Sequence, residues 1–296
     1  MILENSIEVI WTSFLFYSFC GWLMETVLIS FKENKFVNRG FLNGPFCPIY
    51  GVGMLGIAII CSPYIHNYIL VFILGMVTAT TVEYLTAWLL EILFKASWWD
   101  YSENRFNIKG RVCLSVSLYW GLLALVFIVF IQPFILAKIN AIDSKMLLIF
   151  FYVSSTIFIF DTILSVVSAS KLTNKIKIFI DNIPHFDDLI QVARELDYVG
   201  VVSDDSKSYS LGDLINNIKR TIATVKKNPS INKTIVRLNE AKSDYLEELE
   251  KVIKEFTNDF SNGENRLIKA FPKLKFKEIK KHFLAIEKKG KQKNDK

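Results

Sequence analysis

The chain has 296 residues, 51% of them hydrophobic, and a formal net charge of +6 at pH 7. The hydrophobic residues lie mostly before residue 170, in long blocks that exclude a wholly soluble protein. Residues 1–170 contain 9 Lys/Arg and 10 Asp/Glu, whereas residues 171–296 contain 26 and 19. This composition predicts a transmembrane domain over 1–170 and a basic tail over 171–296.

Five apolar blocks approach the ~20 residues that a membrane-spanning helix needs. In chain order they are about Ile7–Phe31, Pro45–Pro63, Tyr68–Phe94, Cys113–Ala137 and Met146–Ser170. The second is the shortest and contains two prolines near its start, so a re-entrant or tilted segment is an alternative there. The fold expected is all-α: a polytopic membrane protein with about five transmembrane helices and a helical cytoplasmic tail.

The basic residues between these blocks predict the orientation. Residues 32–44 contain three Lys/Arg and residues 95–112 contain four, against none and two in the other two connections. Because cytoplasmic loops are enriched in Lys and Arg, the N-terminus is expected outside and the C-terminus in the cytoplasm. The location expected is the cell (inner) membrane.

The tail is expected to be helical and coiled-coil-like. One apolar stripe recurs at steps of three and four: Leu238, Ala241, Tyr245, Leu249, Val252, Phe256 and Phe260. Another helix is expected over Leu211–Val225, with a break at Asn228-Pro229. From Arg266 onward the tail is rich in Lys, which favours contact with the anionic membrane surface, although a protein partner or a plain soluble helix also fits. No motif that reads nucleic acid occurs, so no such partner is expected.

Four acidic residues stand inside the apolar blocks: Glu25, Glu83, Glu91 and Asp161. Each costs roughly 2.5–3.5 kcal/mol in a bilayer and must face protein, a partner or water. The third block shows why protein is expected, because small residues and acids alternate there at steps of four: Gly75, Ala79, Glu83, Ala87 and Glu91. Small residues on one helix face allow close helix packing.

Two interpretations of the four acids remain open. In the functional one, Glu25, Glu83, Glu91 and Asp161 line an intramembrane polar cavity. In the structural one, each is an anchor paired with an arginine or a hydroxyl, and this is preferred for Glu91, near the end of its block.

The two basic connections carry polar residues that a plain connector does not need. Asn38, Arg39, Asp100 and Arg111 are predicted to form a cytoplasmic vestibule for an anionic head group or a partner subunit. The alternative, which is preferred for the two arginines, is that they neutralise Glu25 and Glu91. Trp98-Trp99 is explained by the preference of Trp for the membrane interface alone.

Motifs of catalysis are missing. There is no Walker A loop, no H-E-x-x-H and no G-x-S-x-G. The G-x-G-x-x-G of residues 51–56 lies inside an apolar block, where helix packing explains it better than a dinucleotide. No catalytic residue, metal or cofactor is therefore expected, and the chain is not expected to be an enzyme.

Long motifs resemble the bacterial ABC-transporter type IV permease family over about residues 10–135. They include Phe16-Tyr17-Ser18-Phe19-Cys20-Gly21-Trp22-Leu23-Met24-Glu25, Asn38-Arg39-Gly40-Phe41-Leu42-Asn43-Gly44-Pro45 and Trp98-Trp99-Asp100-Tyr101-Ser102. The resemblance implies a permease subunit that moves a substrate with a separate ATPase subunit.

Two other functions stay open beside the permease. One is a membrane scaffold or regulatory protein whose tail binds a partner or lipid. The other is a membrane enzyme acting on lipid head groups, with a carboxylate as base and Arg39 or Arg111 on the phosphate. Five spans are few for a pore, so a homo- or hetero-oligomer in the lipid bilayer is expected.

Overall fold

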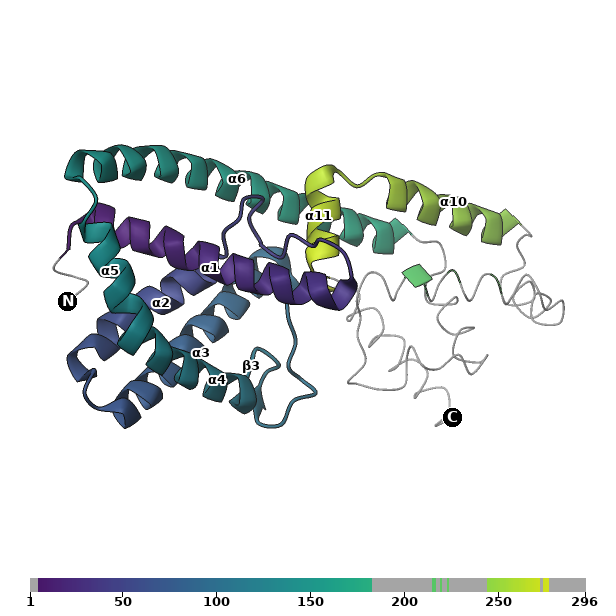
Figure 1. Cartoon of the computed structure of the whole chain (residues 1–296). Helices are drawn as coiled ribbons and strands as arrows, with labels where there is room; N and C mark the ends of the chain where they lie inside the picture. Colours follow the sequence, from purple (N-terminus) through teal and green to yellow (C-terminus); the bar gives the residue numbers. More distant parts are fainter. Residues whose placement is uncertain are drawn as a thin grey trace. The chain divides into compact units, whose positions relative to one another are not determined.

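The computed structural model describes residues 5–182, 215–216, 219, 223, 244–271 and 274–276. These residues are mostly helical (Figure 1). The helices are α1 (Ile7–Glu33), α2 (Pro48–Cys61), η2 (Ser62–Tyr64), α3 (Tyr68–Phe94), α4 (Leu114–Val126), η3 (Phe127–Ile131), α5 (Gln132–Asn140), α6 (Ser144–Asn182), α10 (Asp244–Asn258) and α11 (Asn262–Ala270). Four two-residue strands, β1 (Ala96–Ser97), β2 (Asn107–Ile108), β3 (Val112–Cys113) and β4 (Lys275–Phe276), pair as β1–β4 and β2–β3, both antiparallel.

Four helical segments of the described part are long and apolar enough to cross a membrane. They are Ile7–Glu33, Tyr68–Phe94, Leu114–Asn140 and Ser144–Asp181. They coincide with the first, third, fourth and fifth predicted blocks. The second block forms α2, which has 14 residues and is followed by the short 3-10 helix η2.

Helix α2 is short because the chain before it has already run back along α1. The Cys47 N–H donates to the Ser18 carbonyl at 2.9 Å. Ser18 lies 15 residues before the end of α1, or about 22 Å along its axis at 1.5 Å per residue. The connection of residues 34–47 therefore travels beside the last four turns of α1 before α2 begins.

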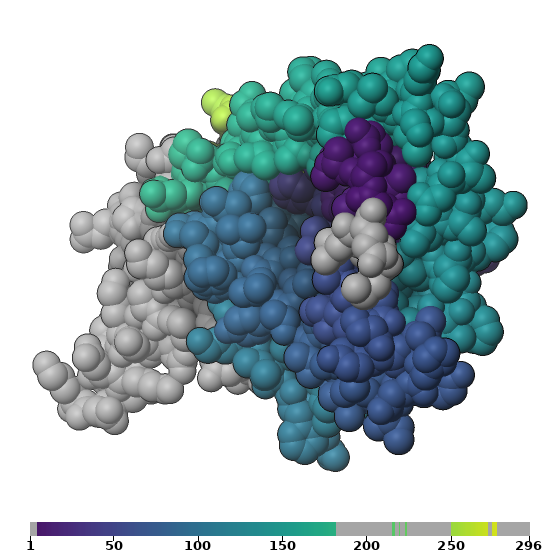
Figure 2. Space-filling view, turned by 90° about the vertical axis from the view of Figure 1, so that its left-hand side faces the viewer, coloured from purple at the N-terminus to yellow at the C-terminus, as the bar shows by residue number. Residues whose placement is uncertain are grey.

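The chain divides into two compact units, the first formed by residues 1–90 and 99–168. Its core gathers around Tyr17 of α1, Ile57 of α2, Val71 of α3 and Phe127 of η3. The N-terminal end of α1 lies between α2–α3 and the teal segment of α5 and α6 (Figure 2). A central position for α1 requires close approach by its neighbours, which small residues permit.

Two glycines show how close that approach is. A Cβ at Gly21 of α1 would lie 2.2 Å from the Tyr50 ring of α2, and a Cβ at Gly75 of α3 would lie 2.2 Å from the Cβ of Ala124. Within the G-x-G-x-x-G segment, Gly51 faces Ser18 and Phe14 of α1, whereas a Cβ at Gly53 would meet nothing within 4 Å. The segment is part of the apolar helix α2, in agreement with the prediction that helix packing explains its glycines.

The helical run from α4 to α5 contains one irregular turn. Residues Phe127–Ile131 form a π-helix just before Pro133, which has no N–H to donate to the helix. The side chain of Gln132, beside that proline, is buried and accepts a hydrogen bond from the Tyr17 phenol of α1. The irregular turn is thus held against α1 by a buried polar contact.

The second unit comprises residues 91–98 and 169–296 and is described only in part. Within it, β1 pairs with β4, and Trp98 packs edge-on against Phe271 with ring centroids 4.8 Å apart. The Phe179 ring of α6 stacks on Phe256 at 3.9 Å. The C-terminal segments of the chain are therefore joined to both the end of α6 and the residues that follow α3.

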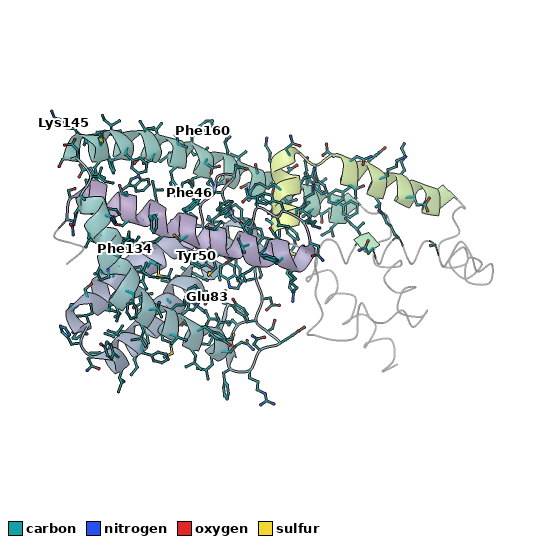
Figure 3. All side chains as sticks on the ribbon, viewed as in Figure 1. Phe46, Tyr50, Glu83, Phe134, Lys145 and Phe160 are labelled. Atoms are coloured by element: carbon teal, nitrogen blue, oxygen red, sulfur yellow. The ribbon has the colours of Figure 1, made fainter. Side chains whose placement is uncertain are left out.

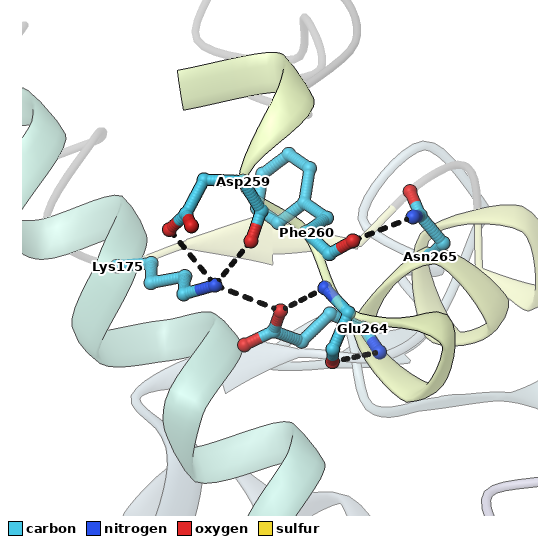
Figure 4. Close-up of polar contacts among 6 residues, drawn as sticks. Lys175, Asp259, Phe260, Glu264 and Asn265 are labelled. Atoms are coloured by element: carbon cyan, nitrogen blue, oxygen red, sulfur yellow. Dashed lines mark hydrogen bonds and ion pairs between the residues drawn. The ribbon is translucent and has the colours of Figure 1, made fainter. Parts of the chain in front are cut away.

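A buried carboxylate organises this second unit (Figure 4). Glu264 of α11 is fully buried, accepts from the Ser261 N–H at 2.7 Å in a capping box, and pairs with Lys175 of α6 at 3.1 Å. Lys175 also contacts the Asp259 carboxylate at 3.0 Å. Burial alone would raise the pKa of Glu264, but the hydrogen bonds from Ser261 and Lys175 outweigh it and hold that pKa below its usual value.

The tail predictions are tested only in part. Four residues of the predicted stripe lie in α10, which is helical as expected: Tyr245, Leu249, Val252 and Phe256. Phe260 lies two residues after the end of α10. The predicted helix Leu211–Val225, the Asn228-Pro229 break, the start of the stripe and most of the basic end lie outside the described residues.

Candidate functional site

One face of α3 is closed off by protein. Gly75, Ala79, Glu83 and Ala87 are all buried, with 6% of Glu83 exposed. Residues on the other faces, such as Leu85 and Leu89, are half exposed. The spacing of four residues places one Cβ above another on a helix. The Glu83 carboxylate consequently faces other helices and not the surface that lipid would cover.

Two neutral side chains hold the Glu83 carboxylate. The Tyr101 phenol donates to Oε1 at 3.1 Å, and the Trp120 indole N–H donates to Oε2 at 3.1 Å. Among the described residues, no Lys or Arg pairs with Glu83. Its two oxygens are therefore hydrogen-bonded while its negative charge has no counter-charge beside it.

Glu25 of α1 is held differently, by a cation and a phenol. Arg39 Nε lies 3.1 Å from Glu25 Oε2, and the Tyr50 phenol donates to Oε1 at 2.7 Å. The Tyr50 ring packs on the Trp120 ring with centroids 5.7 Å apart. Tyr50 and Glu83 lie near each other on the side of α1 away from α6 (Figure 3). These contacts join the two acids into one assembly, the Glu25–Glu83 cluster, composed of Glu25, Arg39, Tyr50, Glu83, Tyr101 and Trp120.

The connections between helices supply half of the donors in the Glu25–Glu83 cluster. Arg39 comes from the connection 34–47, and Tyr101 comes from the connection 95–113. Glu83 lies 11 residues, or about 17 Å, before the end of α3. Both connections thus fold back along the preceding helix to reach a carboxylate in a membrane-spanning segment. Non-helical backbone at that depth occurs where protein or a water-filled cavity surrounds it.

Two groups of the connections, Tyr101 and Cys47, have raised pKa values. Burial, followed by the negative charge of Glu83, raises the pKa of Tyr101 above its ordinary value. Tyr101 therefore stays protonated and donates a hydrogen bond to Glu83. Burial likewise raises the pKa of the Cys47 thiol to about 12, with Glu25 adding to the shift and Arg39 opposing it. Cys47 is a protonated thiol at neutral pH and no candidate nucleophile.

Asp161 has a separate set of partners. Its carboxylate accepts from the backbone N–H groups of Asn43 at 3.0 Å and Gly44 at 2.8 Å, and from the Asn43 side chain at 2.9 Å. Ser165, one turn later on α6, donates to it at 3.5 Å. Asp161 thereby fastens the connection 34–47 to α6. Its geometry is that of a structural anchor.

The predicted vestibule residues have local partners. Asn38 accepts from the Trp22 indole at 2.7 Å and donates to the Asn43 carbonyl at 2.9 Å. Asp100 accepts from the Ser102 N–H at 2.9 Å. Arg111 donates to the Tyr84 phenol at 2.8 Å and lies over its ring. Asn38 and Asp100 shape their connections, whereas Arg39 contacts Glu25 of the cluster.

Glu91 belongs to the second unit, with Ser97 as a partner at 3.4 Å. Of the four predicted acids, Glu25 and Glu83 share neighbours and Asp161 holds a turn, while Glu91 belongs to the second unit. Sequence reasoning missed Tyr50, Tyr101 and Trp120 as partners. The available signal was that each has a polar group on an aromatic ring and stands in or beside a span.

The Glu83 carboxylate has two hydrogen-bond donors, and no cation pairs with it among the described residues. The described residues contain no group of three His, Cys, Asp or Glu that could hold a metal ion. A carboxylate with only neutral donors can exchange a proton or accept a cationic group in place of a missing counter-charge.

The model of the family described as "Putative ABC-transporter type IV" matches residues 12–166, more than half of the chain. The chain belongs to this family. The match extends beyond the first four predicted spans and includes most of the fifth. No curated protein and no solved structure matches the chain. The type IV family and the apolar helices together make this chain a multi-pass membrane protein of the ABC-transporter type.

Proposed function

We propose that this protein is the permease subunit of an ABC transporter, works with a separate ATPase subunit, and has no catalytic activity of its own. The observation that carries the proposal is the Glu25–Glu83 cluster. In it, Arg39 and Tyr101 reach from two connections to carboxylates inside spanning helices. Family membership supports the same function.

The cluster offers a physical route for coupling. A partner that pulls on the connection 34–47 changes the 3.1 Å contact between Arg39 and Glu25. A partner that moves the connection 95–113 changes the contact between Tyr101 and Glu83 in the same way. The first change removes a counter-charge and the second removes a hydrogen bond from a polar site in the membrane. ATP-driven movement of the connections would in this way open or close the site.

Glu83 is the residue proposed to meet the substrate or its proton. A buried charge without a counter-charge destabilises a protein by several kcal/mol unless it is neutralised. Evolution can replace such a group by an apolar residue unless the charge is used. In our proposal Glu25 and Glu83 line the polar cavity during transport, while Asp161 keeps the connection 34–47 in place.

The orientation proposed places both connections on the cytoplasmic side of the inner membrane, where an ATPase can reach them. Their excess of Lys and Arg supports this side. The same orientation places the N-terminus outside and the C-terminal tail in the cytoplasm.

The test is purification of the tagged chain from its native membranes in a mild detergent. A nucleotide-binding subunit should copurify, and its ATPase activity should fall when Glu83→Gln is introduced. Thr81→Ala is the matched control, because Thr81 is exposed on α3 and bonds only to the Val77 carbonyl among the described residues. Repeated isolation of the chain without any nucleotide-binding protein would refute the permease assignment.

The described tail favours one second candidate, a membrane scaffold. Segments α10 and α11 pack on the end of α6 through Lys175, Glu264 and the Phe179–Phe256 stack. A tail held in this way can present a surface to a soluble partner. Removal of residues 244–296 separates the two functions: a scaffold loses its phenotype, whereas a permease retains ATPase copurification and transport.

A further inference from the structure

The connection between α3 and α4 carries a rigid hairpin. Strands β2 and β3 pair Asn107 with Cys113 and Ile108 with Val112. The Asn107 side chain donates to the carbonyls of Ser102 at 3.1 Å and Asn104 at 2.9 Å, and accepts from the Gly110 N–H at 3.0 Å. This amide closes the hairpin on itself. Residues 103–109, called the tip below, comprise the loop before β2, β2 itself and Lys109, and these internal bonds hold them.

The tip has an unusual backbone. Phe106 and Lys109 both have φ of +54°, a region that bulky residues seldom adopt. Gly110 follows with φ of +68°, and a Cβ there would lie 2.5 Å from the Asp100 carboxylate. Strained residues persist where the surrounding contacts enforce them and cluster at functional positions.

The strain presents apolar side chains outward. Phe106 is 78% exposed and Ile108 is 57% exposed. Arg105 and Lys109 beside them are also exposed and have no ion-pair partner among the described residues. By contrast Trp98 is buried, and the Trp99 indole donates to the Arg111 carbonyl. The exposed apolar groups of this connection are thus not the tryptophans that the sequence suggested for the interface.

The hairpin is attached to a helix that is long and apolar enough to cross a membrane. Its base is attached to α3 through the Tyr101–Glu83 and Arg111–Tyr84 contacts, about 17 Å before α3 ends. It projects beyond the helices of the first unit from the start of α4 (Figure 1). A 27-residue helix is about 40 Å long, close to the thickness of a bilayer with its head groups. Because the hairpin is attached well inside the length of α3, its tip is within reach of the head groups of a bilayer that α3 crosses.

Charge and size favour lipid over a protein partner. The two apolar side chains, Phe106 and Ile108, provide much less surface area than the ~800 Å² that each partner contributes to a stable protein interface. Long basic side chains beside apolar ones are suited to lipid, because they reach phosphates while the apolar groups stay among acyl chains.

We propose that residues 103–109 anchor the α3–α4 connection in a leaflet containing anionic lipid. Phe106 and Ile108 insert among the acyl chains, and Arg105 and Lys109 bind lipid phosphates. The anchor holds the base of the hairpin, and with it Tyr101, at a set depth beside Glu83. The lipid contact is independent of the ATPase partner.

The experiment measures the depth of nitroxide labels by electron paramagnetic resonance. Cys20 is the exposed cysteine and is replaced by Ala, while Cys47, Cys61 and Cys113 are buried. Labels are then placed at Phe106→Cys, Ile108→Cys or Glu103→Cys in the full chain. Glu103 is the matched control, an exposed acid in the same tip. The proteins are reconstituted in vesicles of phosphatidylcholine with or without phosphatidylglycerol.

The labels at 106 and 108 should show a severalfold higher ratio of oxygen to nickel-chelate accessibility than the label at 103. Arg105→Gln with Lys109→Gln should lower that ratio at 108 in vesicles with phosphatidylglycerol and change it little in phosphatidylcholine alone. Equal water accessibility at all three sites overturns the proposal. If the labels at 106 and 108 are shielded from both oxygen and the nickel chelate in native membranes but exposed to water in pure lipid vesicles, the proposal is overturned in favour of a protein partner.

Discussion

Arg39 Nε lies 3.1 Å from Glu25 Oε2, so the chain that leaves α1 returns to neutralise a carboxylate of α1. The two side chains are 18% and 32% exposed, which makes the pair partly buried. Loss of the arginine leaves the acid with the Tyr50 phenol.

Arg39→Gln should consequently destabilise the protein by about 1–3 kcal/mol, the usual effect of losing a hydrogen bond to a charged group. Thermal unfolding in detergent measures this. Glu25→Gln in the same background should restore part of the loss, because no charge then lacks its partner. If the losses of stability from Arg39→Gln and Glu25→Gln simply add in the double variant, the two residues do not interact.

Replacement of Gly21 by Ala should disturb Tyr50, the second partner of Glu25. The new Cβ would lie 2.2 Å from Tyr50 Cγ and 2.5 Å from its Cβ, near the backbone of α2, so the helix itself must shift. We expect a loss of about 1–3 kcal/mol from overpacking. Gly53→Ala is the control, since nothing lies within 4 Å of its new Cβ and Ala favours a helix by about 0.5–1 kcal/mol. Equal melting temperatures for the two variants would disprove the tight contact between α1 and α2.

Asp161→Ala should release the connection 34–47. It removes the acceptor of two backbone N–H groups, at Asn43 and Gly44, and leaves both without a partner on α6. Amide hydrogen exchange at residues 43 and 44 should accelerate, and stability should fall by about 1–3 kcal/mol. Ser168→Ala, on the same helix, loses only a hydrogen bond to the Leu164 carbonyl of that helix and should leave exchange at residues 43 and 44 unchanged.

The second unit should loosen in acid. The folded pKa of Glu264 is depressed, so its contribution to stability is present above its ordinary pKa of 4.5 and is lost as pH falls through the lower folded value. Hydrogen exchange of residues 259–271 should therefore rise below about pH 4.5. Lys175→Met should raise that exchange already at neutral pH, whereas Lys177→Met, at an exposed position, should not. Exchange that stays constant down to pH 3 would show that Glu264 does not fasten this segment.

The helices of the first unit could be predicted because residue size and polarity report their surroundings. Gly75, Ala79, Glu83 and Ala87 repeat at the helical period, and all four are buried. Glu83 was therefore recognisable as a residue that faces protein.

The partners of Glu83 could not be predicted. Tyr101 reaches it through an irregular connection whose path depends on backbone angles at Lys109 and Gly110, and such angles leave no periodic pattern. The separation of Asp161 from the acids it was grouped with has the same origin, because its partners are backbone N–H groups of a turn. A side chain that binds backbone cannot be recognised from residue types alone.

The short length of α2 affects how crossings of the bilayer are counted. Its 14 residues extend about 21 Å, less than the ~30 Å of a hydrocarbon core. The connection 34–47 before it, however, has already run back beside α1. If only the four long helices cross the bilayer, the number of crossings is even. If the connection 34–47 and α2 together make a further crossing, the number is odd. Epitope tags at the two ends would decide between them, since only the odd number leaves the ends on opposite faces.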